Sequence, residues 1–337
     1  MDAALLSNSN PECTLVVETF NYLEGVSLDS VRKALRAATA CGATADHNEV
    51  ILADVTGDGA ITRMLADEFP AARYLDAVGR GYDEAKALAA EHARGRYVVY
   101  LDCDCMPQPG WFGRLVAPLR SGEASAVAGF PWYGDGYPAK LQWLMDFGFL
   151  LPRRNRELGC YPSNNSAFLR NLLLRIPEPE GPLRCRCYVH AQALARSATP
   201  VMLVANAEVT HERPPLLRER LRQGYDMIAA CWVDPQLPEA SWLRYGVLAT
   251  PLYYRRRLLL DRRALRHNRE IELGVVGTTA AYPLIAIARL LDAIGMAGAL
   301  MFGPAARRWF DPTSQLLARR ARNAIKAVGD SVPHASV

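Results

Sequence analysis

Two carboxylates, Asp102 and Asp104, stand one residue apart where an apolar run ends, in YVVYLDCDCMPQPGW (97–111). A single aspartate after a strand commonly caps the next helix. Two carboxylates at positions i and i+2 repel each other unless a cation or a set of hydrogen-bond donors compensates their charge. Such hard oxygen ligands suit Mg²⁺ or Mn²⁺, which bind through one or two carboxylates and the phosphates of a substrate. The pair therefore indicates either a site for a metal and a phosphate or a capped loop.

Strands that alternate with helices are expected to position this pair. The strand patterns are TLVVETF (14–20), EVILADV (49–55) and RYVVYLD (96–102), and the helix patterns are SLDSVRKALRAATACG (27–42), GAITRMLADEF (59–69) and YDEAKALAAEHARG (82–95). This alternation predicts parallel strands with crossover connections, in an α/β sheet covered on both faces. Ligands of such sheets bind beyond the carboxyl ends of the strands. We therefore expect residues 19–21, Asp54 and residues 102–104 to meet at one edge.

The composition is that of a folded protein. With 337 residues, of which 50% are hydrophobic, the chain can bury the core of one large domain or about two. A net charge of +4 is mild, so we expect no nucleic-acid partner. The opening MDAALLSNSNPEC (1–13) lacks the basic start and apolar core of a signal peptide. Eight cysteines without the spacing of a small disulfide scaffold suit free thiols, so we expect a cytoplasmic protein.

The cysteines that alternate with the aspartates suggest a second kind of metal site. Cys103 and Cys105 have CxC spacing, and so do Cys185 and Cys187, whereas zinc sites usually carry CxxC. On a strand, Cys103 and Cys105 also point away from the face that carries the aspartates. We therefore interpret these four residues as small packed hydrophobes.

In order along roughly two thirds of the chain, the sequence resembles the family-2 glycosyltransferases, inverting enzymes of the GT-A fold that use nucleotide-diphosphate sugars. LVVETFN (15–21) looks like the first-strand motif of that family, usually VVIPTYN, with Glu18 in place of the proline. EVILADVTGD (49–58) looks like EVIVVDDGSTD; Asp54 keeps the first acid, and Val55 replaces the second.

The most specific part of the resemblance is GRGYDEAKALAAEHARGRYVVYLDCDC (79–105), which is similar to GxAxARNxGIxxAxGEYIxFLDxDD, with Lys86 where an arginine is common. GCYPSNNSAFLR (159–170) resembles the stretch that faces the acceptor. VMLVANAEVTHERP (201–214) resembles the strand that ends in a histidine, here His211. The resemblance implies a GT-A-like, Rossmann-type, mostly parallel sheet flanked by helices.

The resemblance also implies a role for each matching residue. The nucleotide sugar is expected to contact Thr19, Phe20, Asn21, Asp54, Lys86, Asp102 and Cys103, and the acceptor to contact Asn164 and Asn165. Asp104 is expected to bind Mg²⁺ or Mn²⁺ directly. Asp102 lies nearer the ribose or acts through water, and His211 completes the coordination. Such a cation stabilises the charge that grows on the leaving diphosphate.

One departure from the family concerns the general base. Members commonly carry Glu-Asp at the start of the helix before the histidine strand, where this chain has Arg186 and Cys187. An arginine cannot accept a proton at neutral pH. Either His190, four residues on and on the same helical face, is the base, or Glu178 or Glu180 reaches into the site, or Arg186 binds an acceptor that is acidic or phosphorylated. We favour His190.

The C-terminal part has a different composition. Residues 254–270 carry seven arginines and two acids, and residues 273–288 carry no charge. A membrane-spanning helix needs about 20 apolar residues, and Arg289 and Asp292 interrupt this run. We therefore predict helices that lie in the interface of a membrane with an anionic inner leaflet, a pattern that RRARNAIKA (319–327) repeats. The alternative is a buried helical subdomain with a solvated basic face.

Together these features predict a catalytic domain at residues 1–235 and a helical, membrane-associating region at residues 236–337. The predicted enzyme is a metal-dependent inverting glycosyltransferase that takes a nucleotide-diphosphate sugar, in this family most often a UDP sugar. Its predicted acceptor is a glycan or is lipid-linked, and it works as a peripheral or monotopic protein on the inner face of the cell membrane. The first alternative is a base-deficient protein that binds nucleotide sugar or partners without turnover. A nucleotidyltransferase is a weaker alternative, because the glycine-rich phosphate loop is missing. The sequence carries no indication of the oligomeric state.

Overall fold

One half of the central sheet is parallel. The computed structural model describes residues 11–40, 48–181 and 183–310, so the basic segment 319–327 lies outside the described residues. The parallel strands lie in the order β3 (Arg73–Asp76), β2 (Asn48–Asp54), β1 (Cys13–Glu18) and β4 (Tyr97–Asp102). They run in the same direction, so the carboxyl ends of these four strands lie at one edge, as the sequence predicts.

The other half of the sheet is mixed. β8 (Asn165–Leu169) pairs antiparallel with β4 and with β6 (Ala126–Trp132), and β9 (Val201–His211) runs parallel to β6. The short strands β5 (Cys105–Pro107) and β7 (Arg156–Leu158) pair antiparallel with β9. The α/β class is confirmed. The sheet is less parallel than predicted, because β8 enters between β4 and β6 in the opposite direction.

Helices cover both faces of the sheet, as the sequence predicts. In chain order they are α1 (Phe20–Leu23), α2 (Leu28–Ala38), α3 (Gly59–Glu68), α4 (Tyr82–His92), α5 (Trp111–Ser121), α6 (Tyr137–Phe147), α7 (Arg170–Arg175), α8 (Cys187–Arg196) and α9 (Leu216–Val233), with a short 3-10 turn, η3 (Gly148–Leu150), after α6. Alternate residues of β4 face two separate cores: Val98 packs on the side of α4 and α6, and Val99 packs on the side of α2, α3 and α5. Cys103 and Cys105 lie in the second core.

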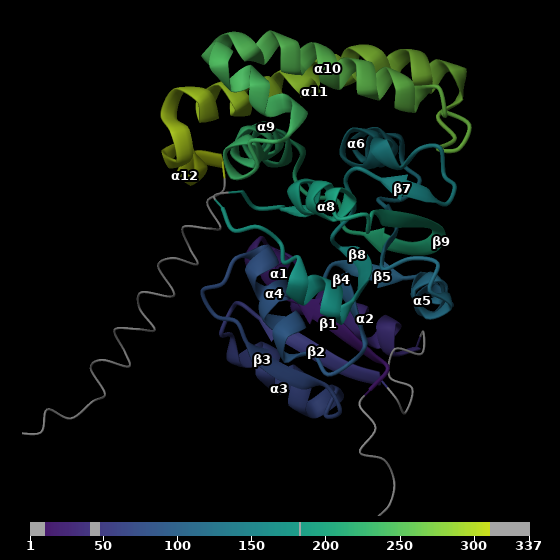
Figure 1. Cartoon of the computed structure of the whole chain (residues 1–337). Coiled ribbons are helices and arrows are strands. Elements are labelled where there is room, and N and C mark those ends of the chain that lie inside the picture. The colour runs from purple at the N-terminus through teal and green to yellow at the C-terminus, as the bar shows by residue number, and fades with distance from the viewer. Residues whose placement is uncertain (1–10, 41–47, 182, 311–337) are drawn as a thin grey trace, which may run out of the picture.

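The C-terminal helices form a layer above the sheet. They are η4 (Pro238–Leu248), α10 (Ala249–Leu265), α11 (Gly274–Phe302), η5 (Gly303–Ala306) and α12 (Arg307–Phe310). Figure 1 shows α10 and α11 side by side across the top of the molecule, over α9 and α6. By length and composition, one helical stretch of the described residues, Gly274–Phe310, is able to cross a membrane, although 44% of its most apolar window is buried.

The two charges that interrupt the apolar run in the sequence lie inside the protein. Arg289 is 1% exposed and Asp292 is fully buried. Arg289 donates two hydrogen bonds of 2.7 Å to the carboxylate of Asp261 on α10 and one of 2.7 Å to Asp292. It also donates to the Met145 carbonyl oxygen on α6 at 2.8 Å. Helix α11 is therefore continuous, and its charges join it to its neighbours while its outer face stays apolar.

Two glycines let α9 and α11 touch through their backbones. A Cβ atom on Gly224 would lie 1.8 Å from the Asp292 carbonyl oxygen, and one on Gly295 would lie 1.9 Å from the Leu221 carbonyl oxygen. No larger side chain fits at either position without separating the helices. This contact fixes the C-terminal helices to α9. The division into a catalytic domain and a C-terminal region at residue 235 stays a prediction.

Candidate active site

Side chains at the ends of β1 and β2 meet as the sequence predicts. The Thr19 hydroxyl donates to Asp54 Oδ1 at 2.8 Å. The Thr56 amide and hydroxyl also donate to that oxygen, and the Tyr74 hydroxyl donates to Asp54 Oδ2 at 3.1 Å. Asp54 is fully buried, so these donors replace water around its charge. In this structure Asp54 holds the loop after β2 in place.

Asp102, at the end of β4, accepts hydrogen bonds from three side chains on two helices, α4 and α1. Lys86 Nζ on α4 donates to Asp102 Oδ1 at 2.7 Å, and the Tyr82 hydroxyl and Asn21 Nδ2 donate to Asp102 Oδ2 at 2.6 and 3.3 Å. Lys86 Nζ also donates to the Tyr82 hydroxyl at 2.7 Å and to the Ser163 carbonyl oxygen at 2.9 Å. Burial lowers the pKa of Lys86, but the charge of Asp102 outweighs this effect and raises it. Lys86 is fully buried and neutralises Asp102 in this structure, and its contact with a phosphate stays a prediction.

Asp104 and His211 form the pair that fits a cation. His211 ends β9 and lies beside β5, where it pairs with Cys105, so its Nε2 comes within 3.3 Å of Asp104 Oδ2. Burial raises the pKa of Asp104, but the charge of His211 outweighs it and the net shift is downward. Burial lowers the pKa of His211, and the charge of Asp104 raises it above its usual value overall. Each group therefore stabilises the charged form of the other.

The donor atoms around this pair suit a hard or borderline divalent ion. The carboxylate, the imidazole and the Cys105 thiol offer one ligand atom each, all within 4.8 Å of one another. Cys105 is fully buried in the core, and a neutral thiol is a poor ligand for Mg²⁺ or Mn²⁺, so we assign the ligand role to Asp104 and His211. The His211 ring stacks on Tyr133, with centroids 5.3 Å apart, and this contact orients Nε2 toward Asp104. Asp102 is engaged by its three donors, so it lies behind the metal pair.

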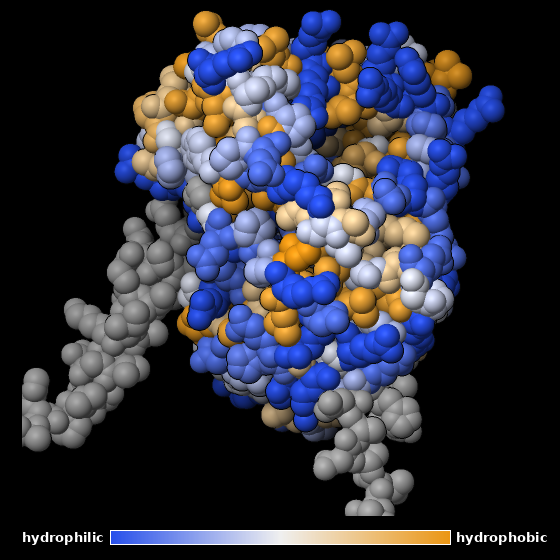
Figure 2. All heavy atoms as spheres, viewed as in Figure 1, coloured by the Kyte–Doolittle hydropathy of each residue, from blue (hydrophilic) through white to orange (hydrophobic). Residues whose placement is uncertain are grey.

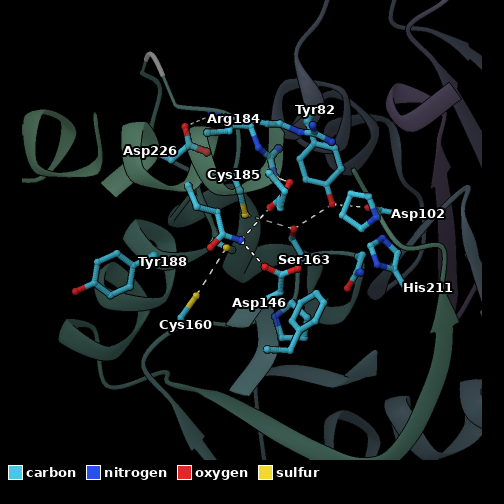
Figure 3. A pocket seen from close by; sticks show the side chains of 18 of the residues that line it. Tyr82, Asp102, Asp146, Cys160, Ser163, Arg184, Cys185, Tyr188, His211 and Asp226 are labelled. Carbon is cyan, nitrogen blue, oxygen red and sulfur yellow. Dashed lines mark hydrogen bonds and ion pairs between the residues drawn. The ribbon is translucent and has the colours of Figure 1, made fainter. Parts of the chain in front are cut away.

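A cavity of about 550 Å³ opens at this edge of the sheet. Asn21, Asp102, Asp104 and His211 line it, and its other walls come from the loop 160–164 and from α8, α9 and α10. Figure 3 shows Tyr82, Ser163 and Asp102 directed toward one another next to His211, while Tyr188 and Cys160 lie on the opposite side. A cavity of this volume accommodates a ligand of the size of a drug molecule or a nucleotide.

The family follows from a match over these same elements. Residues 14–176, which include β1 to β8 and both aspartates, match the family described as glycosyl transferase family 2. This part of the chain is a family-2 glycosyltransferase domain. No curated protein matches the chain at a significant level.

Solved structures share the fold of this chain. The mannosyltransferase PcManGT from Pyrobaculum calidifontis, solved with GDP-Man and Mn²⁺, has a TM-score of 0.56 and 18% identity, over 90% of this chain and 88% of its own. GalNAc-T7, solved with UDP, GalNAc and Mn²⁺, has a TM-score of 0.51 and 11% identity, over 72% of this chain and 51% of its own. This chain therefore spans about half the length of GalNAc-T7. The GT-A fold is confirmed.

Several residues to which the resemblance assigns contact with the donor lie outside the cavity. Cys103 packs in the core, so it offers no side chain to a nucleotide sugar. Thr19, Phe20, Asp54 and Lys86 are also absent from its lining. They support the cavity from behind. The Phe20 ring, for example, packs edge to face against Tyr82, which lines the cavity, with ring centroids 5.8 Å apart.

The two asparagines predicted to contact the acceptor have different surroundings. Asn164 lines the cavity, and its Oδ1 is buried without a hydrogen-bond partner in the described part of the chain. Asn165 lies on β8, where its Nδ2 donates to the Ala207 carbonyl oxygen at 3.0 Å and its Oδ1 accepts from the Trp111 indole at 2.8 Å. Asn164 is therefore available to a sugar hydroxyl, whereas Asn165 joins β8 to β9 and α5.

His190, the predicted base, and Arg186, four residues before it, also lie away from the cavity. His190 is fully buried; its Nδ1 is 2.8 Å from the Tyr161 hydroxyl, and its Nε2 is 2.9 Å from the Ile176 carbonyl oxygen. Burial lowers its pKa. Arg186 donates its backbone N–H to Asp83 at 2.7 Å and its Nη2 to Glu84 at 2.9 Å. These contacts give both residues a structural role, so the prediction that His190 is the base is not supported.

Sequence reasoning missed two residues of the cavity. Arg184 Nη2 donates to Asn21 Oδ1 at 2.8 Å, and its guanidinium carbon lies 4.8 Å from the Phe20 ring centroid. Glu212 follows His211 directly, and its backbone N–H donates to the Asp104 carbonyl oxygen at 3.0 Å. Both line the cavity. Glu212 was within reach of sequence reasoning, because it is adjacent to a predicted metal ligand.

Proposed function

We propose that the protein is an inverting glycosyltransferase that moves a sugar from a nucleotide-diphosphate sugar to a glycan or a lipid-linked acceptor. The observation that carries this proposal is the Asp104–His211 pair, which lies in a cavity at the edge of a family-2 glycosyltransferase sheet. UDP is the nucleotide we expect in the donor. The two similar solved structures hold GDP-Man in one case and UDP in the other, so both classes belong in the test.

In this proposal Asp104 and His211 hold Mn²⁺ or Mg²⁺, which supplies positive charge to the leaving diphosphate when it is bound. The chain itself holds these ligands in place: β9 positions His211, and the Lys86–Asp102 ion pair supports the turn that carries Asp104. Arg184 faces the same cavity, where Glu24 and Asn21 hold its planar guanidinium, a group suited to bind a phosphate. Asn164 is positioned to accept a hydrogen bond from a sugar hydroxyl.

We assign the general base to Glu212. Most other carboxylates that line the cavity are already engaged: Glu24 pairs with Arg218 at 2.7 Å, and Asp146 accepts from the Tyr133 hydroxyl at 3.0 Å. Within the described part of the chain, the Glu212 side chain makes no hydrogen bond or ion pair, and it is exposed at the cavity next to His211. A free carboxylate near the reacting centre is able to accept the proton of an acceptor hydroxyl.

Nucleotide release from a panel of UDP, GDP and dTDP sugars, each with Mn²⁺ or Mg²⁺, tests the proposal. We expect release from at least one donor, and its loss in Asp104→Ala. The matched control is Asp67→Ala, which removes an exposed carboxylate from α3. Release that persists in Asp104→Ala contradicts the assignment of the metal site. Glu212→Gln should slow transfer to a hydroxyl acceptor while leaving donor binding intact.

A base-deficient glycosyltransferase-like protein is the second candidate, because Arg186 and Cys187 stand where the family usually carries two acids. Calorimetry distinguishes the two. Donor and Mn²⁺ that bind without nucleotide release under any acceptor condition favour the second candidate.

We also propose that the enzyme works on the inner face of the cell membrane, held there by α10 and α11. Figure 2 shows hydrophobic and hydrophilic side chains mixed over these helices at the top of the molecule. Val275, Val276 and Ile287 of α11 are well exposed, and Arg255 and Arg262 of α10 are exposed near them. Apolar side chains flanked by arginines suit an anionic membrane surface. Flotation with vesicles should show binding to anionic lipid that weakens with salt; equal binding to neutral vesicles contradicts the role of the arginines.

A further inference from the structure

The cavity that contains the metal pair is also lined by one face of α10. Tyr253, Arg256, Arg257 and Leu260 contribute to this wall. Their spacing of three, four and seven residues places them on the same side of the helix. The site of the reaction and the C-terminal helices therefore share one continuous space, which any acceptor that reaches Asp104 enters together with the donor.

One cation on this wall has no acidic partner among the described residues. Arg256 forms an ion pair with Glu239. Arg257 donates its Nη2 to the Met145 carbonyl oxygen at 3.2 Å, and its Nε is buried without a hydrogen-bond partner. Across residues 11–40, 48–181 and 183–310, Arg257 forms no ion pair. Because an unsatisfied buried donor is unfavourable, an anionic group in the cavity would stabilise this side chain.

The same wall leads to an apolar surface. Leu260 and Phe149 line the cavity, and they are 40% and 39% exposed, so they stand at its rim. Leu259, the residue next to Leu260, lines a groove of about 530 Å³ between α10 and α11, whose other lining side chains are aliphatic or aromatic apart from Arg255, Asp261 and Arg262. Asp261 is the acid in this lining, and Arg289 neutralises its charge, so a hydrocarbon chain that leaves the cavity over Leu260 meets no unpaired carboxylate in this groove.

We propose that the acceptor is a lipid-linked phosphate. Its reacting oxygen lies toward Asp104 and His211, its phosphate lies at Arg257, and its hydrocarbon chain passes Leu260 to the outer face of α10. A water-soluble glycan would leave this cation and the apolar rim unused. The inference rests on the proposed glycosyl transfer and adds the chemical class of the acceptor.

The transfer balances for either form of such an acceptor. The bond between the anomeric carbon and the donor diphosphate breaks, and its electron pair leaves with the nucleoside diphosphate. The acceptor oxygen forms the new bond to the anomeric carbon. A hydroxyl on a lipid-linked sugar gives its proton to Glu212, whereas an ionised phosphate oxygen has no proton to give.

The test uses the full chain in mixed micelles, with the donor that supports nucleotide release. The acceptors are a polyprenyl phosphate, a polyprenyl diphosphate sugar, the same polyprenol without phosphate, and a water-soluble alkyl glycoside. We expect transfer to one of the two phosphorylated lipids, and which of them reacts identifies the reacting oxygen. Transfer to the polyprenol or the glycoside at an equal rate overturns the proposal. Inhibition by phosphatidic acid that is as strong as inhibition by the phosphorylated lipids also overturns it, because the cavity would then bind bulk headgroups.

Two variants test the named residues. Arg257→Gln should lower kcat/KM for the lipid phosphate by roughly 10- to 100-fold, the range expected for one charged hydrogen bond. Leu260→Gln, at an exposed position that does not threaten folding, should raise KM for the lipid. Both should leave acceptor-independent nucleotide release unchanged, which separates this inference from the proposed function itself. Arg263→Gln removes the same charge from an exposed position of α10 that lines neither the cavity nor the groove, and it serves as the control; a loss equal to that of Arg257→Gln overturns the assignment.

Discussion

Substitution of Lys86 by methionine tests the buried ion pair behind the metal site. Lys86 and Asp102 have side chains that are 1% and 3% exposed, with Nζ 2.7 Å from Oδ1. Lys86→Met keeps the volume of the side chain close to that of lysine but leaves the Asp102 charge without its cation. Asp102 keeps the donors Tyr82 and Asn21.

The expected loss is large because the remaining charge is buried. Removing one partner of a buried ion pair destabilises a protein by about 3–5 kcal/mol. The two remaining donors place Lys86→Met near the lower end of this range, about 3 kcal/mol, out of a typical stability of about 5–15 kcal/mol. Adding Asp102→Asn removes the stranded charge, so the double variant should recover about 2 kcal/mol.

Urea denaturation of the wild type, both single variants and the double variant gives the coupling free energy through a double-mutant cycle. Lys33→Met, at a lysine whose side chain is 60% exposed, is the control and should change stability by less than about 0.5 kcal/mol. A stable Lys86→Met protein with weakened donor binding would refute the structural reading, and it would support the sequence-based expectation that Lys86 contacts a phosphate.

Three further predictions concern charge. Asp104→Asn should weaken Mn²⁺ binding by more than about 100-fold in calorimetry, because loss of a ligand exceeds the effect of losing a residue that only orients one; unchanged binding would place the metal elsewhere. Because the pKa of His211 is raised, protons compete with the metal, so Mn²⁺ affinity should fall about tenfold per pH unit below that pKa; a pH-independent affinity would exclude His211 as a ligand. Burial, followed by the charge of Glu178, raises the pKa of Asp83. Its contribution to stability is complete below the unfolded-state value of about 4 and is lost as pH rises through the folded-state pKa, so the wild type should lose more stability than Asp83→Asn as pH rises above about 4 in urea titrations; parallel curves would contradict this.

The sequence is informative where spacing along a parallel strand determines position. Asp104 follows β4, and the strand alternation alone predicts that it lies at the same edge as Asp54. His211 comes from the resemblance, and the structure brings it to Asp104 because β5 and β9 pair there.

The sequence is less informative about burial. Lys86 and His190 are predicted to be functional because their types suit phosphate binding and proton transfer. In the structure other elements cover both side chains: the Ser163 carbonyl oxygen reaches Lys86, and the Ile176 carbonyl oxygen reaches His190. These partners are distant in sequence, so no local pattern reveals them.

Helix α11 shows a related limit. In a count of consecutive apolar residues, Arg289 and Asp292 interrupt the helix. Their spacing of three residues, however, places them on one face of it. That face points toward Asp261 and Arg220, whose positions depend on the packing of α9 and α10.

The glycine contact between α9 and α11 has a geometric consequence. Because Gly224 and Gly295 bring the two backbones together, α11 cannot tilt without moving α9, which itself lines the cavity. Once the outer face of α11 rests on a bilayer, Asp104 stands at a constant height above the lipid. On the proposed membrane binding, transfer would be limited to acceptors whose reactive group extends that far from the bilayer.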